Sequence, residues 1–185
     1  MTADSDPGPD GPPRAALIAA LTLAVGAIAT ILGVATTRHN HLEPVTVPAV
    51  PAPAASGRSC AALIAALPDE LGEFRHATIA DPAPEGARAW RSRAGTQPVV
   101  LRCGLERPDD FVIGSPIQVV DRVQWFEVAA QSGGEADGST WYTVDRPVYV
   151  SLALPTGSGP TPIQDLSAVI DATIPAVPID PRRFR

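Results

Sequence analysis

Gln97-Pro98-Val99-Val100-Leu101-Arg102-Cys103-Gly104 is the stretch that decides the fold, and it closes a longer segment that begins at Trp90. Its positions Val99, Leu101 and Cys103 fall on one face of an extended chain, and Arg102 falls on the other, as in a half-buried strand. The stretch also holds the second of the only two cysteines. It therefore predicts a strand that can be tied covalently to another part of the domain.

The other cysteine belongs to a predicted helix over Ser59–Leu67, which ends before Pro68. Cys60 and Leu63 open the apolar stripe of this helix, because the spacing of its apolar residues follows the helical period. Two cysteines are too few for a structural zinc site but suffice for one bridge. If oxidised, Cys60 and Cys103 would close a loop of about 44 residues, which contributes roughly 4 kcal/mol of stability. Such a bond lasts only in an oxidising compartment.

The composition bounds the class of protein. The chain has 185 residues, of which 45% are hydrophobic, and a net charge of −6. This length and apolar content suit one packed domain and a tether. The negative charge argues against a nucleic-acid partner, which normally needs a basic face. No pattern of ligand residues indicates a metal site or another cofactor.

The N-terminal region predicts a membrane anchor. Residues 1–14 are rich in Asp, Gly and Pro, and we expect a disordered cytoplasmic segment. Residues Ala15–Thr37 carry no charge, and a helix of this length matches a bilayer, so we predict a transmembrane helix in contact with lipid. A cleaved signal peptide is the alternative, since Gly33-Val34-Ala35 resembles a cleavage site.

The anchor hypothesis sets a location for the rest of the chain. Residues 38–57 are rich in proline and predict an extended linker. The cysteine pair favours a cytoplasmic N-terminus and an extracytoplasmic domain over residues 58–176, followed by a flexible tail over 177–185. We therefore expect a single-pass protein of the cell membrane, or a secreted protein if the leader is cleaved.

Within the domain, period-two patterns alternate with turn residues, and a second amphipathic helix begins at Thr161 and ends near Pro175. Its apolar stripe includes Ile163, Leu166 and Ile170. The order helix, strands, helix predicts an α+β fold: one small antiparallel sheet with two helices on one face, preceded by one transmembrane helix. The strands expected in the sheet are Val99–Cys103, Val123–Ala129, Trp141–Val144 and Val148–Leu154.

Several short motifs resemble one known family. They are Leu67-Pro68, Ala89-Trp90, Val100-Leu101-Arg102-Cys103-Gly104, Trp125-Phe126, Asp145-Arg146, Tyr149-Val150 and Leu166-Ser167. Together they resemble an actinobacterial family catalogued as domain of unknown function 3515, over roughly residues 58–175. The resemblance implies a single-pass or secreted envelope protein without an established activity, and it supplies no mechanism.

No catalytic motif is evident. The chain lacks the nucleophile elbow of hydrolases, and both cysteines are better explained as a pair. The residues that could form a binding site are Trp90, Arg102, Trp125, Asp145 and Arg146. Arg102 could be a solvated strand residue or half of an anion site with Arg146. Asp145 and Arg146 could instead brace a turn, and the two tryptophans could be core residues or an exposed aromatic pair.

Two functions therefore stay open. The first is a non-catalytic, membrane-tethered interaction module of the cell envelope, with an envelope protein or glycan as its partner. The alternative is an envelope enzyme or small-ligand-binding domain that uses the region of Arg102 and Arg146. The absence of a nucleophile, base or metal pattern favours the first.

Overall fold

The computed structural model describes residues 14–38, 43–92, 97–129 and 138–183, and the chain divides into two compact units, Met1–Leu42 and Glu43–Arg185. The described part of the first unit is one helix, α1 (Arg14–Arg38). A helix needs about 20 consecutive apolar residues to cross a bilayer, and none among the described residues is long and apolar enough. The prediction of a transmembrane helix over residues 15–37 is therefore wrong, and the expected lipid contact through it is not supported. Apart from Arg14, the segment predicted to be disordered lies outside the described residues.

The second unit is built on an antiparallel sheet of eight strands in the order β1-β2-β3-β4-β8-β7-β6-β5. The strands are β1 (Glu70–Leu71), β2 (Phe74–Ala77), β3 (Ala87–Ser92), β4 (Val99–Leu105), β5 (Gln118–Val120), β6 (Val123–Ala129), β7 (Gly138–Thr143) and β8 (Tyr149–Pro155). The prediction of a small sheet is wrong. Beyond the four predicted strands, β1, β2 and β3 extend the sheet at one edge and β5 extends it at the other. Three of them, β1, β2 and β5, have only two to four residues, so each gives a weak sequence signal, and pairing with a longer neighbour stabilises it.

The order of the strands shows two meanders joined side by side. β1 to β4 follow one another across one half of the sheet, and β5 to β8 follow one another across the other half. β8 returns to the middle and pairs with β4, Leu101 opposite Leu152. The strand predicted to decide the fold therefore lies at the centre of the sheet, where both of its edges are paired.

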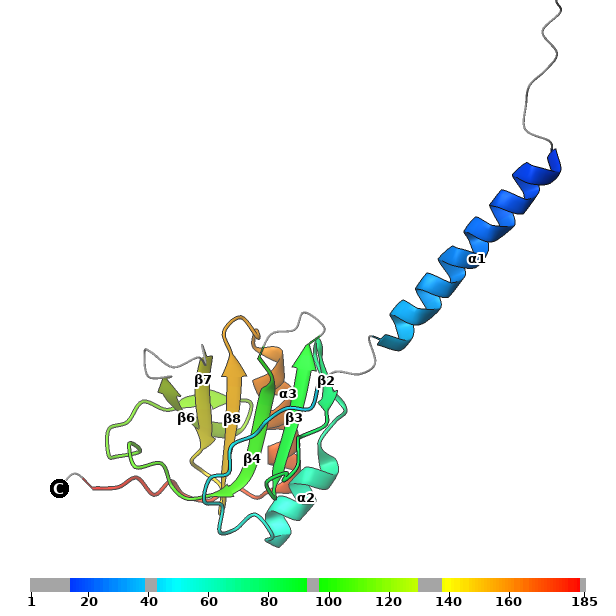
Figure 1. The fold of residues 1–185 in the computed structure, drawn as a ribbon. Helices are drawn as coiled ribbons and strands as arrows, with labels where there is room; N and C mark the ends of the chain where they lie inside the picture. The colour runs from blue at the N-terminus through cyan, green and yellow to red at the C-terminus, as the bar shows by residue number, and fades with distance from the viewer. Residues whose placement is uncertain (1–13, 39–42, 93–96, 130–137, 184–185) are drawn as a thin grey trace, which may run out of the picture. The chain divides into compact units, whose positions relative to one another are not determined.

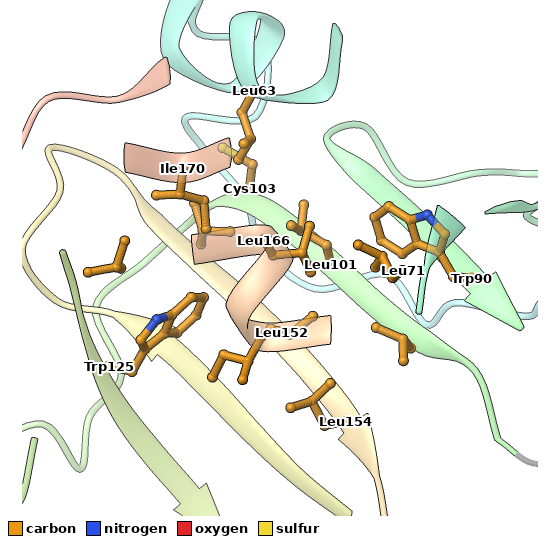
Figure 2. Close-up of a cluster of buried hydrophobic side chains, with 14 of the residues drawn as sticks. Leu63, Leu71, Trp90, Leu101, Cys103, Trp125, Leu152, Leu154, Leu166 and Ile170 are labelled. Carbon is orange, nitrogen blue, oxygen red and sulfur yellow. The ribbon is translucent and has the colours of Figure 1, made fainter. Parts of the chain in front are cut away.

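The helix α3 (Thr161–Thr173) lies against one face of this sheet, and α2 (Arg58–Ala66) packs on α3 at one end of the strands (Figure 1). Leu166 and Ile170 of α3 point toward the strands, among side chains that include Leu152 and Trp125 (Figure 2). Ile163, Leu166 and Ile170 are all buried, as the stripe predicted. Both helices and the alternating residues of the strands contribute to one apolar core.

The disulfide between Cys60 and Cys103 is present, with 5.5 Å between the two Cα atoms. It joins α2 to β4, and both cysteines are fully buried in the core. The next residue, Gly104, has a φ of +90° and lies where the chain before α2 crosses β4. A Cβ at Gly104 would lie 2.2 Å from the backbone N of Ala55, so no larger residue fits without a shift.

The opposite face of the sheet is partly covered by the segment that was predicted to be a linker. Its residues 39–42 lie outside the described part, but from Glu43 to Gly57 the chain runs over this face toward α2 (Figure 1). Val45 and Val47 are buried there, and the amide of Val45 donates to the carbonyl of Thr78 at 2.8 Å. Residues 43–57 are therefore part of the domain and not a free spacer.

The segment after α3, predicted to be a flexible tail, also pairs with the domain as far as it is described. Arg182 forms an isolated parallel bridge with Val112. The guanidinium of Arg107 donates to Asp180 at 2.8 Å, and that of Arg182 contacts Asp109 at 2.7 Å. These contacts hold residues 180–182 along the connection between β4 and β5.

Candidate functional site

A hollow on the sheet face opposite the two helices is the best candidate site, and we call it the Arg102 trough. In one row across the sheet, Arg102 on β4 lies opposite Ser151 on β8, which lies opposite Tyr142 on β7. In the next row, Ala153 of β8 lies between Val100 of β4 and Thr140 of β7. Adjacent strands are about 4.8 Å apart, so the small side chains of β8 leave a depression between the longer ones on β4 and β7.

The trough has a volume of about 570 Å³, which lies in the range of small-molecule sites. Its floor contains Ser151 and Ala153, and one wall is formed by Val47 and Val50 from the segment that crosses the sheet. Val50 is 46% exposed, although it is a large aliphatic residue. The site therefore combines an apolar wall, an open side and a polar floor.

Arg102 is the only positively charged residue among those that line the trough in the described part of the chain. It is half-buried, and its guanidinium forms no ion pair or hydrogen bond with another described residue. Burial lowers the pKa of Arg102 from its ordinary value, and nearby Tyr142 partly offsets this. A charge that is partly removed from water without a counter-ion is costly, so an anion bound here would be stabilised.

Two further polar groups in the same row also have no side-chain hydrogen bond to another described residue. They are the hydroxyls of Tyr142 and Ser151. Burial raises the pKa of Tyr142, and the charge of Arg102 acts in the opposite direction with a smaller effect. The Tyr142 hydroxyl therefore keeps its proton at neutral pH and can donate a hydrogen bond into the trough.

Acidic residues lie at the margins. Glu106 lines the trough, and Glu85 lines a smaller hollow of about 240 Å³ that shares Val50, Arg102 and Leu105 with it. Both glutamates are exposed, and neither reaches Arg102 in an ion pair. Arg102 thus lines the cavity and is not paired with a carboxylate of the described residues.

A family model described as "Protein of unknown function (DUF3515)" matches residues 21–179. The chain belongs to the DUF3515 family. No curated protein and no solved structure matches it. The description of the family states no activity, so membership in the family assigns no function to this chain.

In this DUF3515 domain each residue of Leu101-Arg102-Cys103-Gly104 has a different structural role. Leu101 is in the core, Arg102 is in the trough, Cys103 holds α2, and Gly104 admits the crossing chain. The motif therefore joins the stability of the domain to its candidate site within four residues.

The two tryptophans proposed as binding residues lie in the core of the DUF3515 domain. Trp90 is fully buried, and its indole N–H donates to the carbonyl of Pro68 at 2.9 Å. Trp125 is also fully buried and donates to the hydroxyl of Ser167 on α3 at 2.9 Å. Neither ring reaches the surface, so they do not form an exposed aromatic pair.

Asp145 and Arg146 are also structural and lie away from Arg102. Arg146 is buried and contacts the carboxylates of Asp145 at 2.9 Å and Asp171 of α3 at 3.2 Å. Arg122 pairs with the other oxygen of Asp171. This cluster fixes the turn between β7 and β8 to α3 on the helix side, whereas Arg102 lies on the other face. The alternative in which Arg102 and Arg146 share an anion site is therefore wrong.

A second hollow of about 560 Å³ is lined by Trp141, Leu154 and Pro160, among others. None of the described residues that line it is charged, and the indole of Trp141 already donates to Ser139 at 2.8 Å. It offers fewer free polar groups than the Arg102 trough.

The sequence interpretation missed Tyr142, Ser151, Val47 and Val50. Small residues alternating along 148–154 were the available signal for the floor, but only the pairing of β8 between β4 and β7 places them beside Arg102.

Proposed function

We propose that the domain is a non-catalytic binding module of the cell envelope, which works in an oxidising compartment and recognises an anionic partner through the Arg102 trough. The observation that carries the proposal is the half-buried guanidinium of Arg102, which has no partner among the described residues. The trough provides enclosed volume beside this charge. A cavity of this kind with a charged group placed in it has the basic features of a small-molecule binding site.

The proposed location rests on the disulfide. A bond between Cys60 and Cys103 persists outside a reducing cytosol. Among the described residues, no helix is long and apolar enough to serve as the expected transmembrane anchor.

The absence of catalysis is proposed from the chemistry of the lining. Ser151 is the hydroxyl on the floor, and the described residues that line the trough include no histidine or lysine to act as a base. Their one carboxylate, Glu106, is exposed and forms no hydrogen bond with Ser151. His76, on β2, contacts Arg88 at 3.4 Å and is outside the trough. Both tryptophans are buried, so they cannot stack on a glycan at the surface. The charge of Arg102, which is unpaired among the described residues, therefore supports an anionic partner more strongly than the tryptophans support a glycan.

Site-specific photo-crosslinking in cells tests the proposal. A photoreactive amino acid at Val50, an exposed residue of the trough wall, should capture a partner, whereas the same group at exposed Ala172 on α3 should not. Adding Arg102→Gln should remove the Val50 product without changing the amount of folded protein. Equal products at both positions, or a product that is indifferent to Arg102→Gln, would contradict the binding function. Turnover of the captured molecule by the purified chain would contradict its non-catalytic part.

A further inference from the structure

We infer that the Arg102 trough binds a single carboxylate that is joined to a small apolar group. This inference rests on the proposed function and specifies its ligand. Arg102 would hold the carboxylate, and the aliphatic wall of Val47 and Val50 would hold the apolar group.

The charges favour a monoanion. Among the described residues that line the trough, Arg102 is the one cation and Glu106 is the one carboxylate. A dianion such as phosphate would keep an unbalanced negative charge close to Glu106, whereas a carboxylate is neutralised by one guanidinium. The planar fork of an arginine also matches the two oxygens of a carboxylate in a bidentate pair.

The row of the sheet supplies further donors. Ser151 lies between Arg102 and Tyr142, and all three side chains lack a hydrogen bond to another described residue. A carboxylate has about four acceptor positions. It could therefore accept from Arg102 and from a hydroxyl of the same row, and these are groups that have no hydrogen bond to another described residue.

The lining also contains a set of short aliphatic side chains, next to polar residues such as Thr46 and Thr140. Val47 and Val50 lie on the crossing segment, Val100 on β4 and Ala153 on β8. These side chains would bury an apolar group of a few carbons against the wall of the trough. A free short-chain acid and the C-terminus of a peptide that ends in an aliphatic residue share this chemistry.

Titration calorimetry with the full chain tests the inference. The probes are N-acetyl-alanyl-valine, its C-terminal amide, hexanoate and inorganic phosphate. The carboxylate of the dipeptide or of hexanoate should bind, and the amide should bind at least about tenfold more weakly, because a hydrogen bond to a charged group contributes about 1.5–3 kcal/mol. Arg102→Gln should weaken binding by a similar factor, and Tyr142→Phe should weaken it less.

Arg75→Gln is the matched control, since Arg75 is an exposed arginine on β2 that pairs with Glu70. It removes the same charge and should leave the affinity unchanged. A preference for the dipeptide over hexanoate would identify a chain terminus as the source, and equal binding would identify a free acid; both outcomes support the carboxylate class.

Three results would overturn the ligand class: equal binding of the acid and its amide, binding of phosphate alone, or no binding of either carboxylate. If the Val50 crosslink persists in any of these cases, the trough remains a binding site and only its ligand is wrong. If the crosslink is also absent, both inferences fail.

Discussion

Gly104 shows how one residue sets the path of two segments. Its positive φ and the close approach of Ala55 both oppose a side chain. We expect Gly104→Ala to lower the free energy of unfolding by about 2–5 kcal/mol, from backbone strain and overpacking together. Urea denaturation measures it. Gly114→Ala is the control, because Gly114 has a φ of +91° but no atom within 4 Å of the added Cβ. Equal losses in the two variants would show that the crossing chain does not press on Gly104.

Arg146 is the second residue whose removal should be costly. Its side chain is buried and balances the buried carboxylate of Asp145 and that of Asp171. Arg146→Ala should lower the free energy of unfolding by about 3–5 kcal/mol, because it leaves a buried charge unpaired. Arg122→Ala, at the exposed end of the same cluster, should cost less than about 1 kcal/mol. Denaturation of both variants compares them, and a small loss for Arg146→Ala would contradict the structural role of the cluster.

At the scale of elements, α3 is held to the sheet by its apolar stripe. Leu166 is fully buried between α3 and the strands (Figure 2). Leu166→Ala should cost about 2–5 kcal/mol in thermal or urea unfolding, since it removes buried apolar area and leaves a cavity. Asp165→Ala, on the exposed side of the same helix, should change stability by less than about 0.5 kcal/mol. If Leu166→Ala also lowered the free energy of unfolding by less than about 0.5 kcal/mol, α3 would not be docked on the sheet.

The disulfide joins two elements, α2 and β4. Replacing Cys60 and Cys103 together by alanine should lower the free energy of unfolding by about 2–5 kcal/mol, mainly because the unfolded chain is no longer cross-linked. A reducing agent should destabilise the native chain by a similar amount and leave the double variant unchanged. Sensitivity of the double variant to the reducing agent would indicate another cause.

At the scale of the whole molecule, the domain begins before its first predicted helix. Val45 and Val47 are buried against the sheet. A chain that starts at Glu43 should unfold with nearly the free energy of the full chain. One that starts at Ala52 should lose about 3–6 kcal/mol, because two aliphatic side chains are no longer buried. Denaturation of the three chains measures this, and equal stability throughout would restore the linker hypothesis.

Local patterns in the sequence were sufficient to predict those strands and helices whose buried residues recur with the period of the element. The alternation of Val99, Leu101 and Cys103 predicted β4 and its inward face, and the stripe around Leu166 predicted the docking face of α3. The pairing of Cys60 with Cys103 followed from counting, because two cysteines allow one bridge. The placement of Arg102 on the face opposite Cys103 followed from the period of a strand.

Only the tertiary structure decided the neighbours of these residues. Apolar length alone predicted a membrane helix over 15–37, which the structure does not support. Proline content alone predicted a spacer over 38–57, yet Val45 and Val47 pack on the sheet. The trough exists because β8 places Ser151 between Arg102 and Tyr142. Such contacts depend on strand order and register across long chain separations, whereas propensity and periodicity act only over a few residues.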